Sequence, residues 1–177
     1  MSEASSHPIL QSGVRWLWIA ALVIVLDQVT KLWIQNSMGL YQTIELLPVL
    51  NIYHTFNPGA AWSMCADCGG WQRWMFSALA VGVSGALVVW LRRLPLAGHA
   101  QLVLGLVLIV GGAFGNLIDR IYLGHVVDFI QAHWGNSYFP SFNVADSAIS
   151  IGAALVILDS LREAQRERRA KAAGTDS

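Results

Sequence analysis

Three aspartates that could do acid–base chemistry lie next to two long apolar stretches. Asp119 and Asp128 follow the apolar residues 100–118, and Asp146 opens an apolar run that continues to residue 157. A carboxylate at the edge of the hydrocarbon layer is costly unless it is paired or functional. These three aspartates are therefore the first candidates for an active site.

Asp128 and Asp146 are the two that we expect to form a catalytic pair. Two carboxylates held close together cannot both ionise easily, so one keeps a proton and can act as general acid while the other accepts a proton from water. This is the chemistry of an aspartic peptidase. Spacing alone also allows a structural alternative, in which both are ordinary turn and helix-end residues and Asp146 satisfies free N–H groups at a helix start.

Polar residues near the 100–118 stretch could support such a pair. Asn116, Asp119 and Arg120 gather at its end. Arg120 could pair with Asp119, orient a dyad carboxylate, or hold a substrate carbonyl or a lipid phosphate. Asn57 precedes a Pro-Gly turn and is either a substrate ligand or a turn residue.

Asp27 and Lys31 lie inside another apolar stretch. They are four residues apart, so they share one helix face and can neutralise each other. We expect a structural ion pair here and not direct catalysis.

Metal chemistry and a bound cofactor are not expected. His125 and His133 lack the spacing of the H-E-x-x-H zinc motif, which the chain does not contain. Cys65 and Cys68 form a C-x-x-C pair, but no second cysteine pair or histidine at ligand spacing accompanies it. We expect an incidental cysteine pair, which could oxidise on the outer face.

The elements that must position these residues span a membrane. The 177 residues are 55% hydrophobic and only 12% charged, whereas about a quarter of an ordinary soluble domain is charged. A helix needs about 20 mostly apolar residues to cross a bilayer core, and four stretches qualify: residues 16–34, 74–91, 100–118 and 144–161. In the third, Gly111 and Gly115 have the small-xxx-small spacing that lets helices approach closely. We predict one integral membrane domain over residues 1–177, all-α with a small β element.

The basic residues predict the orientation of the four spans. Eight of the eleven lysines and arginines lie at the start of the chain, in the loop after residue 91 and in residues 162–177, and the positive-inside rule places these segments in the cytoplasm. Residues 1–14 then form a short cytoplasmic lead, and residues 35–73 and 119–143 lie on the outer face. The basic tail, residues 162–177, is expected to bind anionic lipid of the inner leaflet.

The outer segments should contain strands. Residues 43–46 alternate in polarity and residues 49–56 are rich in β-branched and aromatic side chains, a pattern typical of two short strands. Residues 126–129 are expected to be extended within a turn-rich loop. Open strands cannot face lipid without unsatisfied backbone groups, so these strands should lie at the outer surface, where they could wall a site.

Four motifs occur in order along the chain and cover about residues 16–161. They are Asn57-x-Gly59-Ala60-Ala61, Gly111-Gly112-Ala113-x-Gly115-Asn116-x-x-Asp119-Arg120, Gly124-x-Val126-Val127-Asp128-Phe129 and Phe142-Asn143-x-Ala145-Asp146. Together they resemble the bacterial lipoprotein signal peptidases, the signal peptidase II family.

The resemblance implies an intramembrane aspartic endopeptidase of the bacterial inner membrane. Such an enzyme removes the signal peptide of a prolipoprotein on the amino side of its diacylglyceryl-modified cysteine. The catalytic positions correspond to Asp128 and Asp146. The positions that line the site or hold the dyad correspond to Asn57, Asn116, Arg120 and Asn143, and those with supporting roles correspond to Asp27, Lys31 and Asp119. A strand-built cradle and a short outer surface helix are also implied.

Two features depart from the family pattern, and two other functions are alternatives. Pro58 stands where proline is not expected, and the Cys65–Cys68 pair does not belong to the pattern. A proton- or ion-coupled transporter would also carry charged residues in its spans, but nearer the bilayer midplane. A Ser/Lys peptidase could use Lys31 with Ser147 or Ser63. We expect a monomer whose partners are diacylated prolipoproteins and membrane lipid, and the zero net charge gives no reason to expect nucleic acid.

Overall fold

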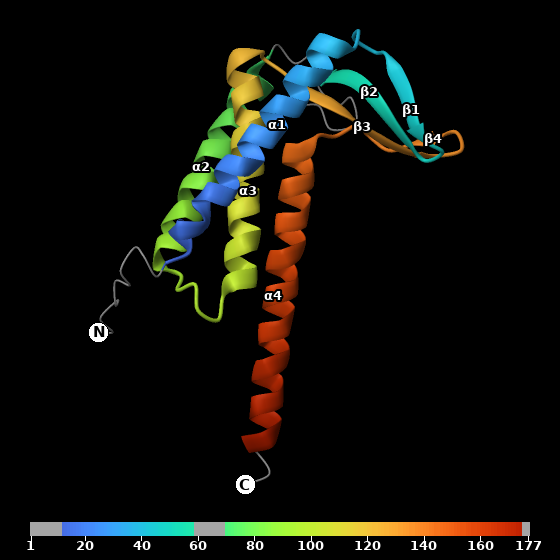
Figure 1. Cartoon of the computed structure of the whole chain (residues 1–177). Helices are drawn as coiled ribbons and strands as arrows, with labels where there is room; N and C mark the ends of the chain where they lie inside the picture. Colours follow the sequence, from blue (N-terminus) through green and yellow to red (C-terminus); the bar gives the residue numbers. More distant parts are fainter. Residues whose placement is uncertain (1–11, 59–69, 175–177) are drawn as a thin grey trace.

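Four long helices and a small sheet make up the fold, which is known here from a computed structural model describing residues 12–58 and 70–174 (Figure 1). The helices are α1 (Leu17–Ser37), α2 (Trp71–Arg93), α3 (Ala100–Tyr122) and α4 (Val144–Gly174), with a short 3₁₀ turn, η2 (Gly13–Trp16), before α1. The strands are β1 (Thr43–Leu47), β2 (Leu50–Asn57), β3 (Val126–Trp134) and β4 (Ser137–Tyr138).

All four helices are long and apolar enough to cross a bilayer. In the apolar window of α3, 61% of the residues are buried, against 28% or less in each of the other three helices. α3 contacts α1, α2 and α4 and is therefore the centre of the bundle. The other helices expose apolar side chains outward, as expected where the solvent is lipid. The predicted class, a four-span membrane protein with a small β element, is confirmed.

Glycines let the helices approach α3 closely. A Cβ added to Gly111 would lie 3.0 Å from Cα of Ala20 on α1, and one added to Gly115 would lie 2.7 Å from Oδ2 of Asp27. The close approach predicted from the Gly111–Gly115 spacing is thus confirmed. On the other side of α3, a Cβ on Gly112 would overlap the carbonyl oxygen of Ala145 on α4.

The four strands form one antiparallel sheet in the order β1-β2-β3-β4. It extends sideways from one end of the bundle, which we call the sheet end (Figure 1). Phe129 of β3 packs against Ile34 and Met38 at the end of α1, and Nδ1 of His54 donates to the carbonyl oxygen of Met38 at 3.1 Å. The two strands predicted between residues 43 and 56 are confirmed. β3 starts at the predicted position but is longer, and β4 was not predicted.

One segment differs from the sequence prediction. α4 does not end near residue 161 but continues to Gly174, because its Arg, Glu, Gln, Ala and Lys residues are strong helix formers. Figure 1 shows this part projecting beyond the other helices. An outer surface helix does not occur within residues 12–58 and 70–174. Ser63, Cys65 and Cys68 lie outside the described residues.

The contact at Gly112 generates a prediction. Gly112→Ala should destabilise the protein by about 1–3 kcal/mol, the usual cost of overpacking, because the added methyl meets backbone of α4, which cannot rotate away. Gly82→Ala is the matched control, since a Cβ at Gly82 would have no atom within 4 Å. Thermal unfolding in detergent measures the difference, and equal unfolding temperatures for the two variants would contradict this account of the α3–α4 contact.

Candidate active site

The start of α4 is capped by the side chain of Asn143. Oδ1 of Asn143 accepts the N–H of Asp146 at 2.9 Å, and Oδ2 of Asp146 accepts the N–H of Asn143 at 3.3 Å. This reciprocal pair is a capping box, which satisfies two N–H groups that the helix itself leaves free. Asp146 therefore has the helix-start role that the sequence allowed. The same hydrogen bonds also fix the position of its carboxylate.

The same asparagine reaches the second aspartate. Nδ2 of Asn143 donates to Oδ1 of Asp128 at 2.7 Å, to Oδ1 of Asn116 at 3.1 Å and to the carbonyl oxygen of Val127 at 3.2 Å. Asn143 is fully buried. One side chain thus connects the helix that carries Asp146 with the strand that carries Asp128, and the predicted dyad residues come from different elements that meet at this point.

Asp128 is buried in β3, with 2% of its surface exposed. Its Oδ2 accepts Nδ2 of Asn57 at 3.1 Å, because the β2–β3 register places the end of β2 beside this part of β3. Burial, followed by the negative charge of Asp146, raises the pKa of Asp128 to about 7, although the hydrogen bond from Asn57 acts in the opposite direction. Asp128 therefore keeps its proton up to about pH 7, whereas an exposed carboxyl with the ordinary pKa of 3.8 loses its proton at a much lower pH.

Asp146 is more accessible than Asp128. It is only half-buried, and its Oδ1 accepts Nδ2 of Asn116 at 2.7 Å. Two cavities, of about 320 and 540 Å³, both include Asp146 in their walls. The two carboxylates thus differ in environment, as an acid and a base at one site must.

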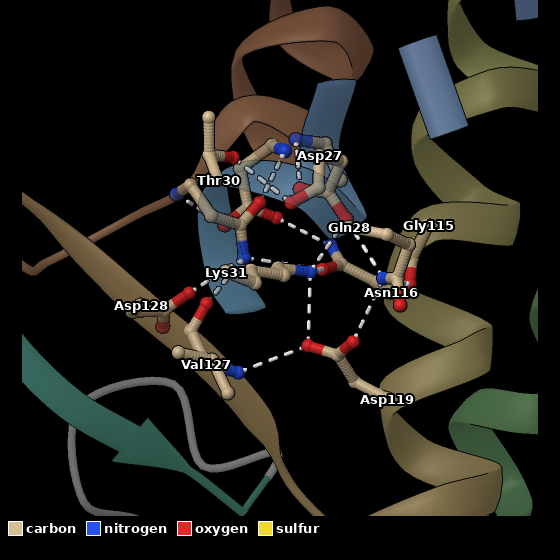
Figure 2. Close-up of polar contacts among 12 residues, drawn as sticks. Asp27, Gln28, Thr30, Lys31, Gly115, Asn116, Asp119, Val127 and Asp128 are labelled. Atoms are coloured by element: carbon tan, nitrogen blue, oxygen red, sulfur yellow. Dashed lines mark hydrogen bonds and ion pairs between the residues drawn. The ribbon is translucent and has the colours of Figure 1, made fainter. Parts of the chain in front are cut away.

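Lys31 is the centre of a buried cluster next to the dyad (Figure 2). Its Nζ lies 2.8 Å from Oδ2 of Asp27 and 2.9 Å from Oδ2 of Asp119. It also donates to Oδ1 of Asn116 at 3.0 Å. These three acceptors use all three protons of the ammonium group. The predicted pair of Asp27 and Lys31 is confirmed, and Asp119 joins it, so Asp119 does not take Arg120 as its partner.

Each carboxylate of this cluster also holds the backbone beside one dyad aspartate. Oδ1 of Asp27 accepts the N–H of Ala145 at 2.9 Å, one residue before Asp146. Oδ2 of Asp119 accepts the N–H of Val127 at 3.1 Å, one residue before Asp128 (Figure 2). The Lys31 cluster therefore fixes both segments that carry the pair.

Gln28 belongs to the cluster and was missed from the sequence. Its Nε2 donates to Oδ1 of Asp119 at 2.9 Å, to Oδ2 of Asp27 at 3.2 Å and to the carbonyl oxygen of Gly115 at 3.2 Å. A polar amide inside an apolar span was a signal that could have identified it.

Arg120 lines the smaller of the two cavities. Its Nη1 donates to the carbonyl oxygen of Asn116 at 3.4 Å, and its Cζ lies 5.2 Å from the centre of the Phe76 ring. It is attracted to Asp146, Asp128 and Asp119. The guanidinium thus adds positive charge beside the dyad from the side of α3.

Comparison with known proteins gives consistent matches over most of the chain. A family model described as signal peptidase (SPase) II matches residues 19–162. The lipoprotein signal peptidase of Shewanella halifaxensis is 52% identical over 84% of this chain and 87% of the relative, and that of Shewanella amazonensis is 46% identical over 90% and 95%. A solved bacterial membrane enzyme has a TM-score of 0.73 at 33% identity, covering 84% of this chain and 88% of its own.

The fold and these matches define the class: this is a multi-pass membrane peptidase. The polar residues of the candidate site are gathered at one end of the four-helix bundle. The chain belongs to the signal peptidase II family.

Lys31→Met should destabilise the protein by about 3–5 kcal/mol, because it leaves two buried carboxylates without a counter-charge. It should also lower turnover, since Asn116 loses the group that orients its amide. Lys171→Met, at an exposed lysine of α4, is the control and should leave both unchanged. Unfolding temperature and cleavage rate are the measurements, and a Lys31→Met protein as stable as the control would contradict the role given to Lys31.

Proposed function

We propose that this chain is an aspartic endopeptidase that removes the signal peptide from diacylglyceryl-modified prolipoproteins, cutting on the amino side of the lipidated cysteine. The observation that carries the aspartic mechanism is the Asn143 side chain, which bridges Asp128 and Asp146. The lipoprotein signal peptidases at about half identity support the substrate class.

Asp128 is the general acid and Asp146 the general base. Asp146 takes a proton from water, and the resulting hydroxide attacks the scissile carbonyl carbon. Asp128 gives its proton to the carbonyl oxygen, which forms a neutral tetrahedral diol. When the C–N bond breaks, the leaving nitrogen takes the proton held by Asp146, and a diol hydroxyl returns a proton to Asp128. The raised pKa of Asp128 and the greater exposure of Asp146 support this assignment.

The surrounding polar groups have separate tasks in this proposal. Asn57 and Asn143 hold Asp128, and Asn116 holds Asp146. Arg120 donates to a substrate carbonyl, because its guanidinium lines the cavity that includes Asp146. The residues that position the dyad without touching substrate are Asp27, Lys31 and Asp119.

The enzyme works in the bacterial inner membrane with both termini in the cytoplasm and the sheet end in the periplasm. The distribution of basic residues supports this orientation. The cluster of carboxylates at one end of the bundle, away from the midplane, argues against a transporter. One chain supplies every residue of the proposed mechanism, so a monomer suffices. A reporter that is active only in the periplasm can be fused after Lys171. Activity of this fusion would contradict the proposed orientation.

Asp128→Asn and Asp146→Asn should each lower the cleavage rate about a hundredfold or more, the usual contribution of general acid–base catalysis. Both variants should still insert and fold, because amide and carboxyl have nearly the same shape. Asp159→Asn, on the part of α4 far from the dyad, is the control and should cleave normally. Near-normal cleavage by either dyad variant at equal expression would refute the assignment.

The pKa of Asp128 predicts the alkaline limb of the pH profile. Above about pH 7 Asp128 loses its proton, so kcat/KM should fall with pH, about tenfold per unit for one essential proton. Because the folded-state pKa is raised, the protonated carboxyl stabilises the fold at low pH, and this stability is lost as pH rises from about 4 to about 7. Asp128→Asn should therefore gain stability relative to wild type at alkaline pH. If the difference in unfolding temperature between Asp128→Asn and wild type did not change with pH, the raised pKa of Asp128 would be contradicted.

The substrate should need its lipid. Each buried methylene contributes about 0.8 kcal/mol of membrane affinity, so two acyl chains hold the cysteine at the depth of the dyad, whereas a peptide without them remains in water. We expect rapid cleavage of the diacylated prolipoprotein and poor cleavage of the unmodified one at high concentration. Comparable rates for the two in the same bilayer would favour a general intramembrane protease.

A further inference from the structure

Two grooves reach Asp146 from different sides of α4. The helix groove, about 320 Å³, lies between α2, α3 and α4 and includes Arg120, Asn116 and Ile149. The loop groove, about 540 Å³, lies between α4 and residues 139–142 and includes Phe139, Ser150 and Ile151. The proposed substrate has two apolar parts at the scissile bond, the signal peptide on one side and the lipidated cysteine on the other. Each part can therefore have a groove of its own.

The helix groove has the properties that a peptide segment requires. Along α3 it extends from Arg120 to Ile109, about 16 Å at 1.5 Å per residue. Its polar groups, Arg120 and Asn116, lie at the Asp146 end, and its deeper wall is apolar. Peptide groups near the cleaved bond need polar partners when they leave water, whereas the deeper part accepts apolar side chains.

The loop groove follows a shorter length of helix than the helix groove does. Along α4 it extends only from Asp146 to Ile151, about 7 Å. One wall is the 139–142 loop, and Ile151, the last residue of the α4 wall, is 56% exposed. A group held here would have its polar part at the membrane boundary and its apolar part continuing into the bilayer.

Backbone hydrogen bonds and a ring contact hold the wall of the loop groove. The N–H of Phe142 donates to the carbonyl oxygen of Ile130 at 3.0 Å, and the N–H of Ile130 donates to the carbonyl oxygen of Phe142 at 2.8 Å. The N–H of Phe139 donates to Ala132 at 2.8 Å. The rings of Phe139 and Phe142 pack edge to face, 6.1 Å apart. β3, which carries Asp128, therefore also holds this wall beside the dyad.

We propose that the loop groove binds the glycerol esters and first methylenes of the diacylglyceryl group on the substrate cysteine, while the remaining acyl chain extends into lipid past Ile151. This inference rests on the proposed function, since it assigns a place to the lipid of that substrate. It requires the lipid to contact α4 and the 139–142 loop and not α2.

Groove-filling substitutions test the assignment kinetically. Ile151→Trp, and separately Ser150→Phe at an exposed position, should raise the apparent KM for a diacylated prolipoprotein about tenfold, the factor expected when about two methylenes lose apolar contact, with little change in kcat. Val81→Trp is the control, because Val81 is 54% exposed on α2 and lines neither groove. Leu79→Trp, 56% exposed in the helix groove, tests the rival assignment.

Crosslinking gives a readout that does not depend on turnover. A prolipoprotein with a diazirine on an acyl carbon close to the ester is bound to the Asp128→Asn variant and irradiated. Adducts within residues 139–151 would support the proposal, whereas adducts within residues 76–83, or a KM effect of Leu79→Trp alone, would overturn it. If the wild-type protein does not cut the diacylated substrate at all, the proposed function is wrong. If the wild-type protein cuts it and Ile151→Trp leaves the KM unchanged, only the assignment of the loop groove is wrong.

Discussion

The contact of the Lys31 ammonium with two buried carboxylates is the interaction on which the site depends. Removing one cation and two anions from water is costly, and the cost is offset only because every donor of Lys31 has an acceptor. Asp27 then uses its other oxygen to accept a backbone N–H of α4, and Asp119 accepts a backbone N–H of β3 with the same Oδ2 that contacts Lys31. The cluster thereby joins α1, α3, α4 and the sheet at a single point.

Asparagine amides carry this order to the dyad. Lys31 has only donors, so Asn116 must turn its oxygen toward Lys31 and its NH2 toward Asp146. Asn143 turns its oxygen to the first turn of α4 and its NH2 to Asp128. Each amide has a determined orientation, and each aspartate receives a donor from a fixed direction. Such preorganisation is what the proposed acid–base chemistry requires.

Close helix packing allows the cluster to exist. Gly115 leaves room for the carboxylate of Asp27, and Gly112 lets the start of α4 approach α3. In a membrane there is no hydrophobic force between helices, so close contact through small residues has a larger share in holding them together. Central α3 therefore has two roles, since it packs the bundle through glycines and supplies Asn116, Asp119 and Arg120 to the site.

The order of apolar stretches, the alternation of residues 43–46 and the Asp27–Lys31 spacing were enough to predict four spans, the first two strands and one ion pair. These features are local, because they follow from helical and strand periodicity within one segment. The third member of the Lys31 cluster, Asp119, is 88 residues away in the chain, and the bridge from Asn143 to Asp128 joins a helix cap to a strand. Gln28 reaches Gly115 and Asp119 of α3 across the helix packing, and the two grooves arise between elements. Such contacts depend on helix packing and strand register, which no spacing along one segment specifies, so only the tertiary structure could decide them.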